Sequence, residues 1–365
     1  TRHETLRTLI KEDEAGGSYQ IVLKANHALK IKEIAIENNL EQLLYEECNH
    51  IYDLSNEIPI RVCIYKEEKN SKNNDYLSIV IHHIAFDGWS TDIFFKELIQ
   101  YYQYYTKQTP VLNLPELEIQ YKDFAIWQKA YLTGDVLTKQ LKFWQDKLSN
   151  YETITLPTDF IRPINIDYKG ADFYFELDEQ TSGLLRELAK ELQVSLYSVL
   201  LTGYCLFLQT YSNQDDLVIG TPIANRHYPQ IQNLIGFFVN TIALRIKINS
   251  KTPIKSLIKD VWQDIIASQN HQDLPFEKLV AELNVPKDTS RHPLFQVMFG
   301  VQSFGGTTIN ELLEPYGQDN LYSIAKFDIS TFIDDSQATL RGSFNYATGL
   351  YKKETIEQFT NTYLV

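Results

Sequence analysis

Tyr76-Leu-Ser-Ile-Val-Ile-His-His-Ile-Ala-Phe-Asp-Gly88 is the stretch from which the fold can be worked out. Residues 76–84 form a short, β-branched run bounded by a turn, which predicts a buried strand. Asp87-Gly88 is a turn signal, and apolar residues at helical spacing predict an amphipathic helix over residues 91–105 with Ser90 as its cap. A strand, a turn and a helix therefore follow one another here.

The interleaving of strands and helices continues along the chain. Helices are expected over residues 121–132, 137–147, 178–192, 195–211 and 253–269, and strands over residues 171–177, 216–219, 240–248, 294–301 and 337–345. This order predicts a mixed α/β (α+β) fold.

Two lobes are expected, because 365 residues are more than one hydrophobic core usually spans. Residues 156–165 hold two prolines and no periodicity, which indicates a hinge. The predicted lobes are residues 1–158, which carry the two adjacent histidines, and residues 159–365. Both ends of the chain lie inside patterned segments, so the first lobe is expected to be truncated at its start and the second at its end.

Composition narrows the class of protein. The net charge is −13 and the sequence pI is about 5.1, so binding to the phosphates of nucleic acid is not expected. No apolar run is long enough to span a bilayer, and no membrane partner is expected. The three cysteines, Cys48, Cys63 and Cys205, suggest no disulfide framework and fit a reducing, cytoplasmic compartment.

His82 and His83 are the candidates for chemistry. Histidine exchanges a proton near neutral pH, and acyl transfer to an amine needs such a group beside the nucleophile. On a strand their side chains would point to opposite faces, so one would face a site and the other would be packed. A packed core histidine is the alternative interpretation. The sequence contains no nucleophile elbow and no zinc-binding motif, so neither an acyl-enzyme nor a metal site is predicted.

The pattern His82-His83-x-x-x-Asp87-Gly88 is similar to the signature of the condensation-domain superfamily, which includes chloramphenicol acetyltransferase. Other segments resemble further motifs of the family, in the family's order. They are Arg2-His-Glu-Thr-Leu-Arg-Thr8, Tyr121-Lys-Asp-Phe-Ala-Ile-Trp-Gln128, Ile219-Gly-Thr-Pro-Ile-Ala-Asn-Arg226, Leu234-Ile-Gly-Phe-Phe-Val-Asn-Thr241, His271-Gln-Asp-Leu-Pro-Phe-Glu277 and Ser290-Arg-His-Pro-Leu-Phe-Gln296. The resemblance covers nearly the whole chain and is specific to nonribosomal peptide synthetases, although the family's first motif, upstream of Arg2, is missing.

The resemblance implies two chloramphenicol-acetyltransferase-like lobes in a V, with a central tunnel between them. It implies that His83 faces the tunnel and orients or deprotonates the acceptor amine, and that His82 is the packed partner. Asp87 is implied to be structural and paired with an arginine, for which Arg7 is the candidate.

Three further residues receive roles from the resemblance. Gly88 is expected to let the turn approach the tunnel without a side chain, where a backbone amide would help to hold an oxyanion. Trp89 and Asn240 are candidate tunnel-lining residues, and a hydrogen bond at the start of a strand is the alternative for Asn240. Tyr121 and Asp123 are interpreted as packing and capping residues.

The implied reaction joins two carrier-bound groups. An upstream carrier domain presents an aminoacyl or peptidyl thioester, and the free amine of an aminoacyl thioester on a downstream carrier attacks its carbonyl. Positioning of the two tethered reactants would supply much of the acceleration. No cofactor is expected on the domain itself, because the phosphopantetheine arms belong to the carriers, and an adenylation domain is an expected neighbour.

Alternatives stay open within the superfamily. An epimerisation domain shares the fold and the histidine motif, but the flanks Ile84-Ala-Phe86 and Pro222-Ile-Ala-Asn-Arg226 resemble condensation domains. The intact histidine pair disfavours a heterocyclisation domain and a non-catalytic module that docks a partner protein. An acyltransferase that uses free coenzyme A would lack the last three motifs. Ala85-Phe86 and Ala224-Asn-Arg226 resemble domains that take a D-configured donor.

Overall fold

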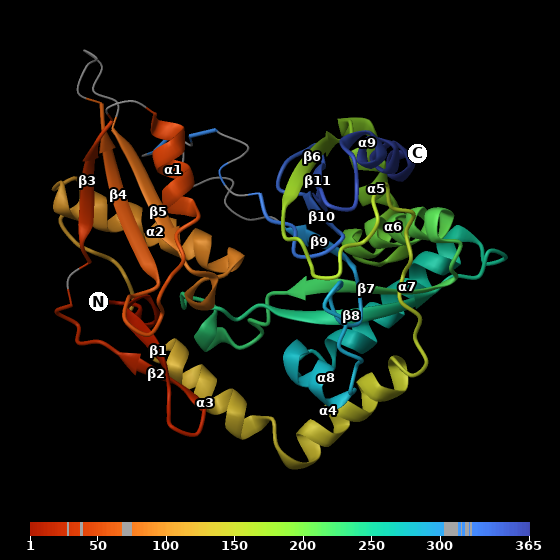
Figure 1. Ribbon diagram of the computed structural model, residues 1–365, viewed down its shortest axis with the longest axis horizontal. Helices are drawn as coiled ribbons and strands as arrows, with labels where there is room; N and C mark the ends of the chain where they lie inside the picture. The colour runs from red at the N-terminus through yellow and green to blue at the C-terminus, as the bar shows by residue number, and fades with distance from the viewer. Residues whose placement is uncertain are drawn as a thin grey trace. The chain divides into compact units, whose positions relative to one another are not determined.

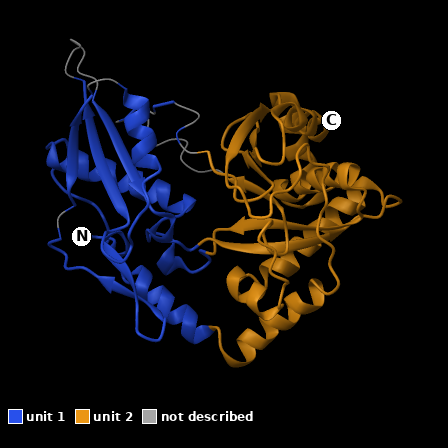
Figure 2. Ribbon diagram, in the orientation of Figure 1, with its two compact units in different colours: residues 1–131, 226–238, 305–322 blue, residues 132–225, 239–304, 323–365 orange. Residues whose placement is uncertain are grey.

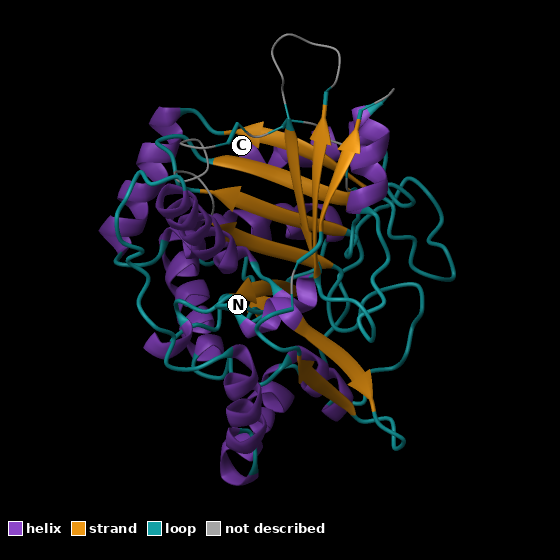
Figure 3. Ribbon diagram, turned by 90° about the vertical axis from the view of Figure 1, so that its left-hand side faces the viewer, coloured by secondary structure: helices purple, strands orange, loops and turns teal. Residues whose placement is uncertain are grey.

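The computed structural model describes residues 1–27, 29–36, 39–67, 75–302, 313–314, 316–317, 321 and 323–365. The chain forms two compact units (Figure 2). Unit 1 comprises residues 1–131, 226–238 and 305–322, and unit 2 comprises residues 132–225, 239–304 and 323–365. Each contains helices and strands. The chain as described is thus built of both kinds of element (Figure 3), which confirms the predicted mixed α/β class.

The predicted boundary between residues 158 and 159 does not match this division. Residues 132–158 belong to unit 2, because Trp144, Leu148, Ile154 and Leu156 are buried in the core of that unit. Residues 226–238 belong to unit 1, where an ion pair holds Arg226. The two prolines of residues 156–165 mark where the periodic pattern stops. They do not show whether the flanking segments pack into the core of unit 1 or of unit 2.

Unit 1 contains two small sheets (Figure 1). The strands β1 (Thr8–Glu12) and β2 (Ser18–Val22) form an antiparallel hairpin. In the second sheet β4 (Ile60–Lys66) lies between β3 (Ile31–Ala35), its parallel neighbour, and β5 (Tyr76–Ile81), its antiparallel neighbour. The unit also contains α1 (Leu40–Cys48), α2 (Gly88–Tyr105), α3 (Tyr121–Tyr131) and the short 3-10 turns η1 (Glu4–Arg7), η2 (His83–Ala85) and η3 (Pro229–Ile231).

Unit 2 is built on a six-stranded mixed sheet with the order β6-β11-β10-β9-β7-β8. Its strands are β6 (Gly170–Glu176), β7 (Asp216–Ile223), β8 (Asn240–Lys247), β9 (Val297–Gln302), β10 (Ile329–Asp334) and β11 (Arg341–Ala347). β9 pairs in parallel with both β7 and β10, and the other pairs are antiparallel. The helices are α4 (Gly134–Lys147), α5 (Glu179–Leu192), α6 (Leu196–Ser212), α7 (Ile254–Gln269), α8 (Phe276–Glu282) and α9 (Lys353–Leu364).

The core of unit 2 lies between the sheet and α6, with α5, α7 and α9 beside that helix (Figure 1). Leu201, Tyr204 and Leu208 recur at helical spacing on α6 and are fully buried. Gly220 allows Phe295 to pack on β7, because a Cβ atom there would lie 2.2 Å from the Phe295 ring. Close packing therefore explains a glycine inside a central strand.

Side-chain caps set several helix starts. The carboxylate of Asp178 accepts from Thr181 N ahead of α5, and Ser195 Oγ accepts from Ser198 N ahead of α6. Among the described residues no single helix is long and apolar enough to cross a membrane, and α5 and α6 pass that test only as a pair bent by 109°.

Candidate active site around His83

The histidine pair lies in a turn rather than on a strand. β5 ends at Ile81, and His82 is the N-cap of η2, where its Nδ1 accepts from Ile84 N at 3.1 Å. The His82 ring also packs edge-on against Tyr52, with ring centres 5.5 Å apart. Strand alternation therefore does not separate the two side chains, but His82 has the packed position expected of it.

His83 presents one ring nitrogen to its surroundings. Its side chain is exposed, and its Nδ1 lies 2.5 Å from the carbonyl oxygen of Phe86. Because a carbonyl only accepts, Nδ1 carries the proton of the neutral imidazole and Nε2 is left as the acceptor. The ring of Phe237 contacts the imidazole edge to face, with centres 4.9 Å apart at 77°. The turn thus holds His83 in the tautomer that a base or an amine-orienting group needs.

Asp87 is buried, with 3% of its surface exposed, and it caps α2. Its Oδ1 accepts from Ser90 N at 2.9 Å and from Ser90 Oγ at 2.7 Å. The helix therefore begins at Gly88, three residues earlier than predicted, because Asp87 rather than Ser90 is the cap. This cap fixes the end of the turn that carries His83.

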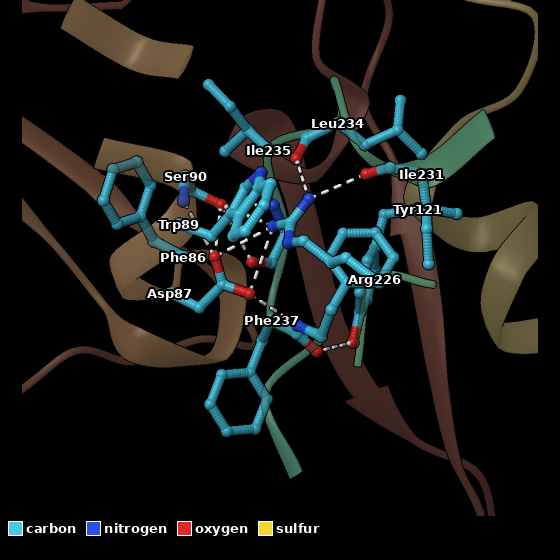
Figure 4. A network of polar contacts seen from close by, with 12 residues as sticks. Phe86, Asp87, Trp89, Ser90, Tyr121, Arg226, Ile231, Leu234, Ile235 and Phe237 are labelled. Carbon is cyan, nitrogen blue, oxygen red and sulfur yellow. Dashed lines mark hydrogen bonds and ion pairs between the residues drawn. The ribbon is translucent and has the colours of Figure 1, made fainter. Parts of the chain in front are cut away.

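The partner of Asp87 is Arg226, and the predicted pairing with Arg7 is wrong. Arg226 Nη2 donates to Asp87 Oδ1 at 2.9 Å and to Oδ2 at 3.1 Å (Figure 4). Arg7 instead donates to the carbonyl oxygen of Leu23 and to Glu4 at 3.3 Å. Glu4 and Arg7 lie three residues apart in η1, so Arg7 pairs locally near the start of the chain and not with Asp87.

The guanidinium of Arg226 is enclosed. Its Nη1 donates to the carbonyl oxygens of Ile231 and Leu234, both at 2.7 Å, and its Cζ lies 4.2 Å from the centre of the Phe238 ring. Burial lowers the pKa of Arg226 from its ordinary value, and the charge of Asp87 opposes that shift. The pair is expensive to break on one side, since the remaining charge would stay buried.

Tyr121 links the middle motif to the same region. Its hydroxyl donates to the carbonyl oxygen of Phe237 at 2.9 Å. Burial, with a smaller contribution from Asp87, raises the pKa of Tyr121 to about 12, so the hydroxyl stays a donor at physiological pH. The carboxylate of Asp123 accepts from Gln120 N at the start of α3, which fits the predicted capping.

Gly88 and Trp89 form the first turn of α2, next to the histidine turn. Helices leave the N–H groups of this turn outside their own hydrogen-bond ladder. Trp89 donates from Nε1 to the carbonyl oxygen of Gln232 at 3.0 Å and is 38% exposed. The roles of Gly88 and Trp89 at a tunnel stay predictions.

Asn240 lies in unit 2, where its amide joins β8 to the loop before α8. Its Nδ2 donates to the carbonyl oxygens of Gln272 and Leu274, both at 2.8 Å, and its Oδ1 accepts from Phe276 N at 3.1 Å. Oδ1 also accepts from Thr241 N at 2.8 Å. The hydrogen-bonding capacity of the amide is thus used within the unit, which fits the alternative of a hydrogen bond at the start of a strand, and the tunnel-lining role stays a prediction.

The sequence matches the model of the condensation-domain family over residues 1–364. This chain belongs to the condensation-domain family. It is 39% identical over 366 residues to N-(5-amino-5-carboxypentanoyl)-L-cysteinyl-D-valine synthase of Amycolatopsis lactamdurans, covering 99% of the chain and 10% of that protein. It is 33% identical to gramicidin S synthase 2 of Brevibacillus brevis, covering 100% of the chain and 8% of that protein. The condensation domain thus spans about a tenth of the length of these relatives.

Solved structures share the fold of this condensation domain. The X-domain from teicoplanin biosynthesis superposes with a TM-score of 0.86 at 23% identity, covering 100% of the chain and 83% of the X-domain. The epimerization domain from the third module of tyrocidine synthetase B gives a TM-score of 0.79 at 21% identity, covering 99% of the chain and 84% of that domain. At these identities the likeness establishes the fold alone.

The sequence hypothesis missed two contributors to the site of this condensation domain. Arg226 was visible as the last residue of a motif, but no role was assigned to it. His3, in the first motif of the chain, is buried with its Nε2 2.8 Å from Glu97 Oε2, and its Nδ1 accepts from Ile235 N at 3.3 Å. Within the part of the chain that the structure describes, no group of three or more His, Cys, Asp or Glu side chains is placed to hold a metal ion.

Proposed function

We propose that this condensation domain forms a peptide bond between an aminoacyl or peptidyl thioester on an upstream carrier and the amine of an aminoacyl thioester on a downstream carrier. The observation that carries the proposal is His83, an exposed imidazole whose Nδ1 is engaged by Phe86 O and whose Nε2 is left as an acceptor. The likeness to an N-(5-amino-5-carboxypentanoyl)-L-cysteinyl-D-valine synthase and to gramicidin S synthase 2 supports the same chemistry.

The step is an acyl transfer to nitrogen. The acceptor amine attacks the donor carbonyl, the new C–N bond forms, the C–S bond breaks and the upstream carrier leaves as a thiol. His83 Nε2 accepts a hydrogen bond from the attacking amine and either orients it or takes its proton, which the departing sulfur then receives. Because the Phe86 carbonyl holds the Nδ1 proton, the imidazole needs no tautomer change before it acts.

Asp87 and Arg226 support this step without contacting substrate. Their buried pair joins the cap of α2 to residues 226–238, so the turn that carries His83 is held from both sides. Loss of either residue would impair activity by moving His83.

The substrates and partners follow from the same proposal. The acyl groups arrive on the phosphopantetheine arms of two carrier domains, the domain itself binds no cofactor, and an adenylation domain lies nearby in the same cytoplasmic synthetase. A D-configured donor is the proposed subtype, on the resemblance carried by Ala85-Phe86 and Ala224-Asn-Arg226.

The test reconstitutes the reaction with the full-length protein and two carriers loaded with defined aminoacyl groups. Dipeptidyl transfer is followed by mass spectrometry with L- and D-donors for the parent, His83→Ala and His27→Ala, the last being an exposed histidine of unit 1 outside the site. We expect product with the parent and His27→Ala, a large loss in folded His83→Ala, and preference for the D-donor.

Two outcomes would contradict the proposal. Loss of donor stereochemistry without a dipeptide would indicate epimerisation, which uses the same fold. No reaction of either kind, with tight binding to another protein, would indicate a docking module.

A further inference from the structure

The backbone of residues 231–238 is held by side chains from several other parts of unit 1. Arg226, Trp89 and Ser90 make five of these contacts, and His3, Tyr121 and Asp87 make the other three. The bonded backbone atoms are the carbonyl oxygens of Ile231, Gln232, Leu234, Gly236 and Phe237 and the amide nitrogens of Ile235, Gly236 and Phe238. Every early motif of the chain thus contributes to fixing one short segment.

Side chains hydrogen-bond to the backbone on both sides of Phe237. Ser90 Oγ accepts from Gly236 N at 3.2 Å, and Asp87 Oδ2 accepts from Phe238 N at 3.0 Å. A Cβ atom on Gly236 would lie 2.4 Å from the Tyr121 ring and 2.7 Å from the Phe238 ring. The backbone that carries Phe237 therefore has no room to shift against α3.

The side chains of residues 234–238 differ in burial. Leu234 and Phe238 join a buried cluster with Phe124, and Ile235 is buried as well. Between residues 234 and 238, Phe237 alone is only partly buried, and its ring lies against the imidazole of His83. The hydrogen-bonded backbone of residues 231–238 thus places the ring of Phe237 against His83.

One hydrogen bond alone does not fix the orientation of the His83 ring. It is exposed, and its hydrogen bond to Phe86 O restrains one edge of the ring only. An edge-to-face contact at 4.9 Å supplies a second restraint in the preferred geometry of aromatic pairs. Together the two contacts determine where Nε2 points.

We propose that Phe237 is a positioning residue for the reaction, whose ring holds the His83 imidazole so that Nε2 is directed at the acceptor amine. The proposal rests on the function proposed for His83. Phe237 acts through the histidine and contributes no group to the bond-making step.

The first experiment measures kinetics in the full-length protein for Phe237→Ala, Phe237→Leu and Phe237→Tyr. We expect kcat for dipeptide formation to fall on the order of 10- to 100-fold in Phe237→Ala with KM for the acceptor carrier little changed, since small misplacements of a catalytic group have effects of this size. Phe237→Leu keeps the bulk but lacks the ring and should remain impaired, whereas Phe237→Tyr should restore kcat.

The second experiment does not depend on turnover. The rate at which diethyl pyrocarbonate modifies His83 is followed by peptide mass spectrometry in the same variants. Removal of the ring uncovers one side of the imidazole, so the rate should rise severalfold in Phe237→Ala and Phe237→Leu and stay at the parent value in Phe237→Tyr. Phe160→Ala, an exposed phenylalanine of unit 2, is the matched control for both measurements and should change neither.

The two experiments separate the failure of this inference from the failure of the proposed function. A parent protein that makes no dipeptide would contradict the proposed function, while the modification rates would still test the contact. Unchanged kcat and unchanged modification of His83 in Phe237→Ala and Phe237→Leu would overturn the inference. A role in folding alone would be shown by full rescue with Phe237→Leu, or by losses that follow the folded fraction.

Discussion

Arg226 Nη2 donates to both carboxylate oxygens of Asp87, at 2.9 and 3.1 Å, across 139 positions of sequence. The Arg226 and Asp87 side chains are 1% and 3% exposed, so the pair is removed from water. It ties the cap of α2 to the segment that carries Phe237. The geometry at His83 thus depends on two residues that lie far apart in the chain.

Breaking this pair on one side should destabilise the domain. Asp87→Asn keeps a helix-capping side chain but leaves the Arg226 guanidinium buried without a counter-charge, and the expected loss is about 3–5 kcal/mol of unfolding free energy. Arg226→Met should also destabilise. The Asp87→Asn, Arg226→Met double variant should cost less than the sum of the two, because neither charge is left alone. Urea denaturation of the four proteins measures these free energies.

The matched control is the exposed pair of Lys255 and Glu191, whose atoms lie 2.6 Å apart with 58% and 60% of the side chains exposed. Lys255→Met should cost at most about 1 kcal/mol, since solvent screens such pairs. Strict additivity of the Asp87 and Arg226 substitutions would show that the buried pair is not coupled.

Tyr121→Phe should affect activity through Phe237. The substitution removes one buried hydrogen bond, from the Tyr121 hydroxyl to Phe237 O, with an expected loss of about 0.5–1.5 kcal/mol. Since the pKa of Tyr121 is raised to about 12, the effect on kcat should be the same from pH 7 to about pH 9. Thermal denaturation and the rate of dipeptide formation measure the two effects.

Tyr105→Phe is the control for this substitution, because Tyr105 lies on α2 with 75% of its surface exposed. It should change neither stability nor rate. A parent-like rate in Tyr121→Phe would mean that the hydroxyl does not help to place Phe237.

Local patterns predicted some helices and strands of unit 2 to within one residue at each end, but they missed β10, α8 and α9. The predicted helices over residues 178–192 and 195–211 begin one residue before α5 and α6, because Asp178 and Ser195 are caps rather than helical residues, and α6 ends one residue later than predicted, at Ser212. The strand predicted over residues 240–248 differs from β8 by one residue at its end. Caps and alternation act over a few residues, so the sequence displays them directly.

The sequence did not show which side chains far apart in the chain would pair with each other. Arg7 was the candidate partner of Asp87, whereas the true partner, Arg226, is separated from Asp87 in sequence by residues 132–225 of unit 2. The strand rule also failed at His82 and His83, because β5 ends at Ile81 and the backbone turns before the pair. The histidines themselves were identifiable from chemistry and resemblance, and their geometry needed the structure.

Glu97 should give the domain a measurable acid sensitivity. Burial raises the pKa of the Glu97 carboxyl, but hydrogen bonds and electrostatic attraction from His3 and Arg2 outweigh burial and hold it below the ordinary 4.5. A lowered pKa in the folded state means that the unfolded chain binds the proton more readily. The stabilisation is therefore present above about pH 4.5 and is lost as the pH falls through the folded pKa.

Glu97→Gln tests this directly. The parent should have the higher Tm near pH 7, and the difference in Tm between parent and variant should shrink as the pH falls below about 4.5. Differential scanning calorimetry from pH 7 to pH 3 measures the difference. If the difference in Tm stayed constant or increased as the pH fell, the lowered pKa of Glu97 would be contradicted.

Two glycines of unit 2 should respond in opposite directions to alanine. At Gly220 the new methyl group would lie 2.2 Å from Phe295, a ring that is fully buried, so Gly220→Ala should destabilise by about 1–3 kcal/mol. At Gly183, inside α5, no atom lies within 4 Å of the position that a Cβ atom would take, so Gly183→Ala should stabilise by about 0.5–1 kcal/mol through helix propensity. Urea denaturation of both variants measures the two signs, and a neutral Gly220→Ala would show that Phe295 can move away from β7.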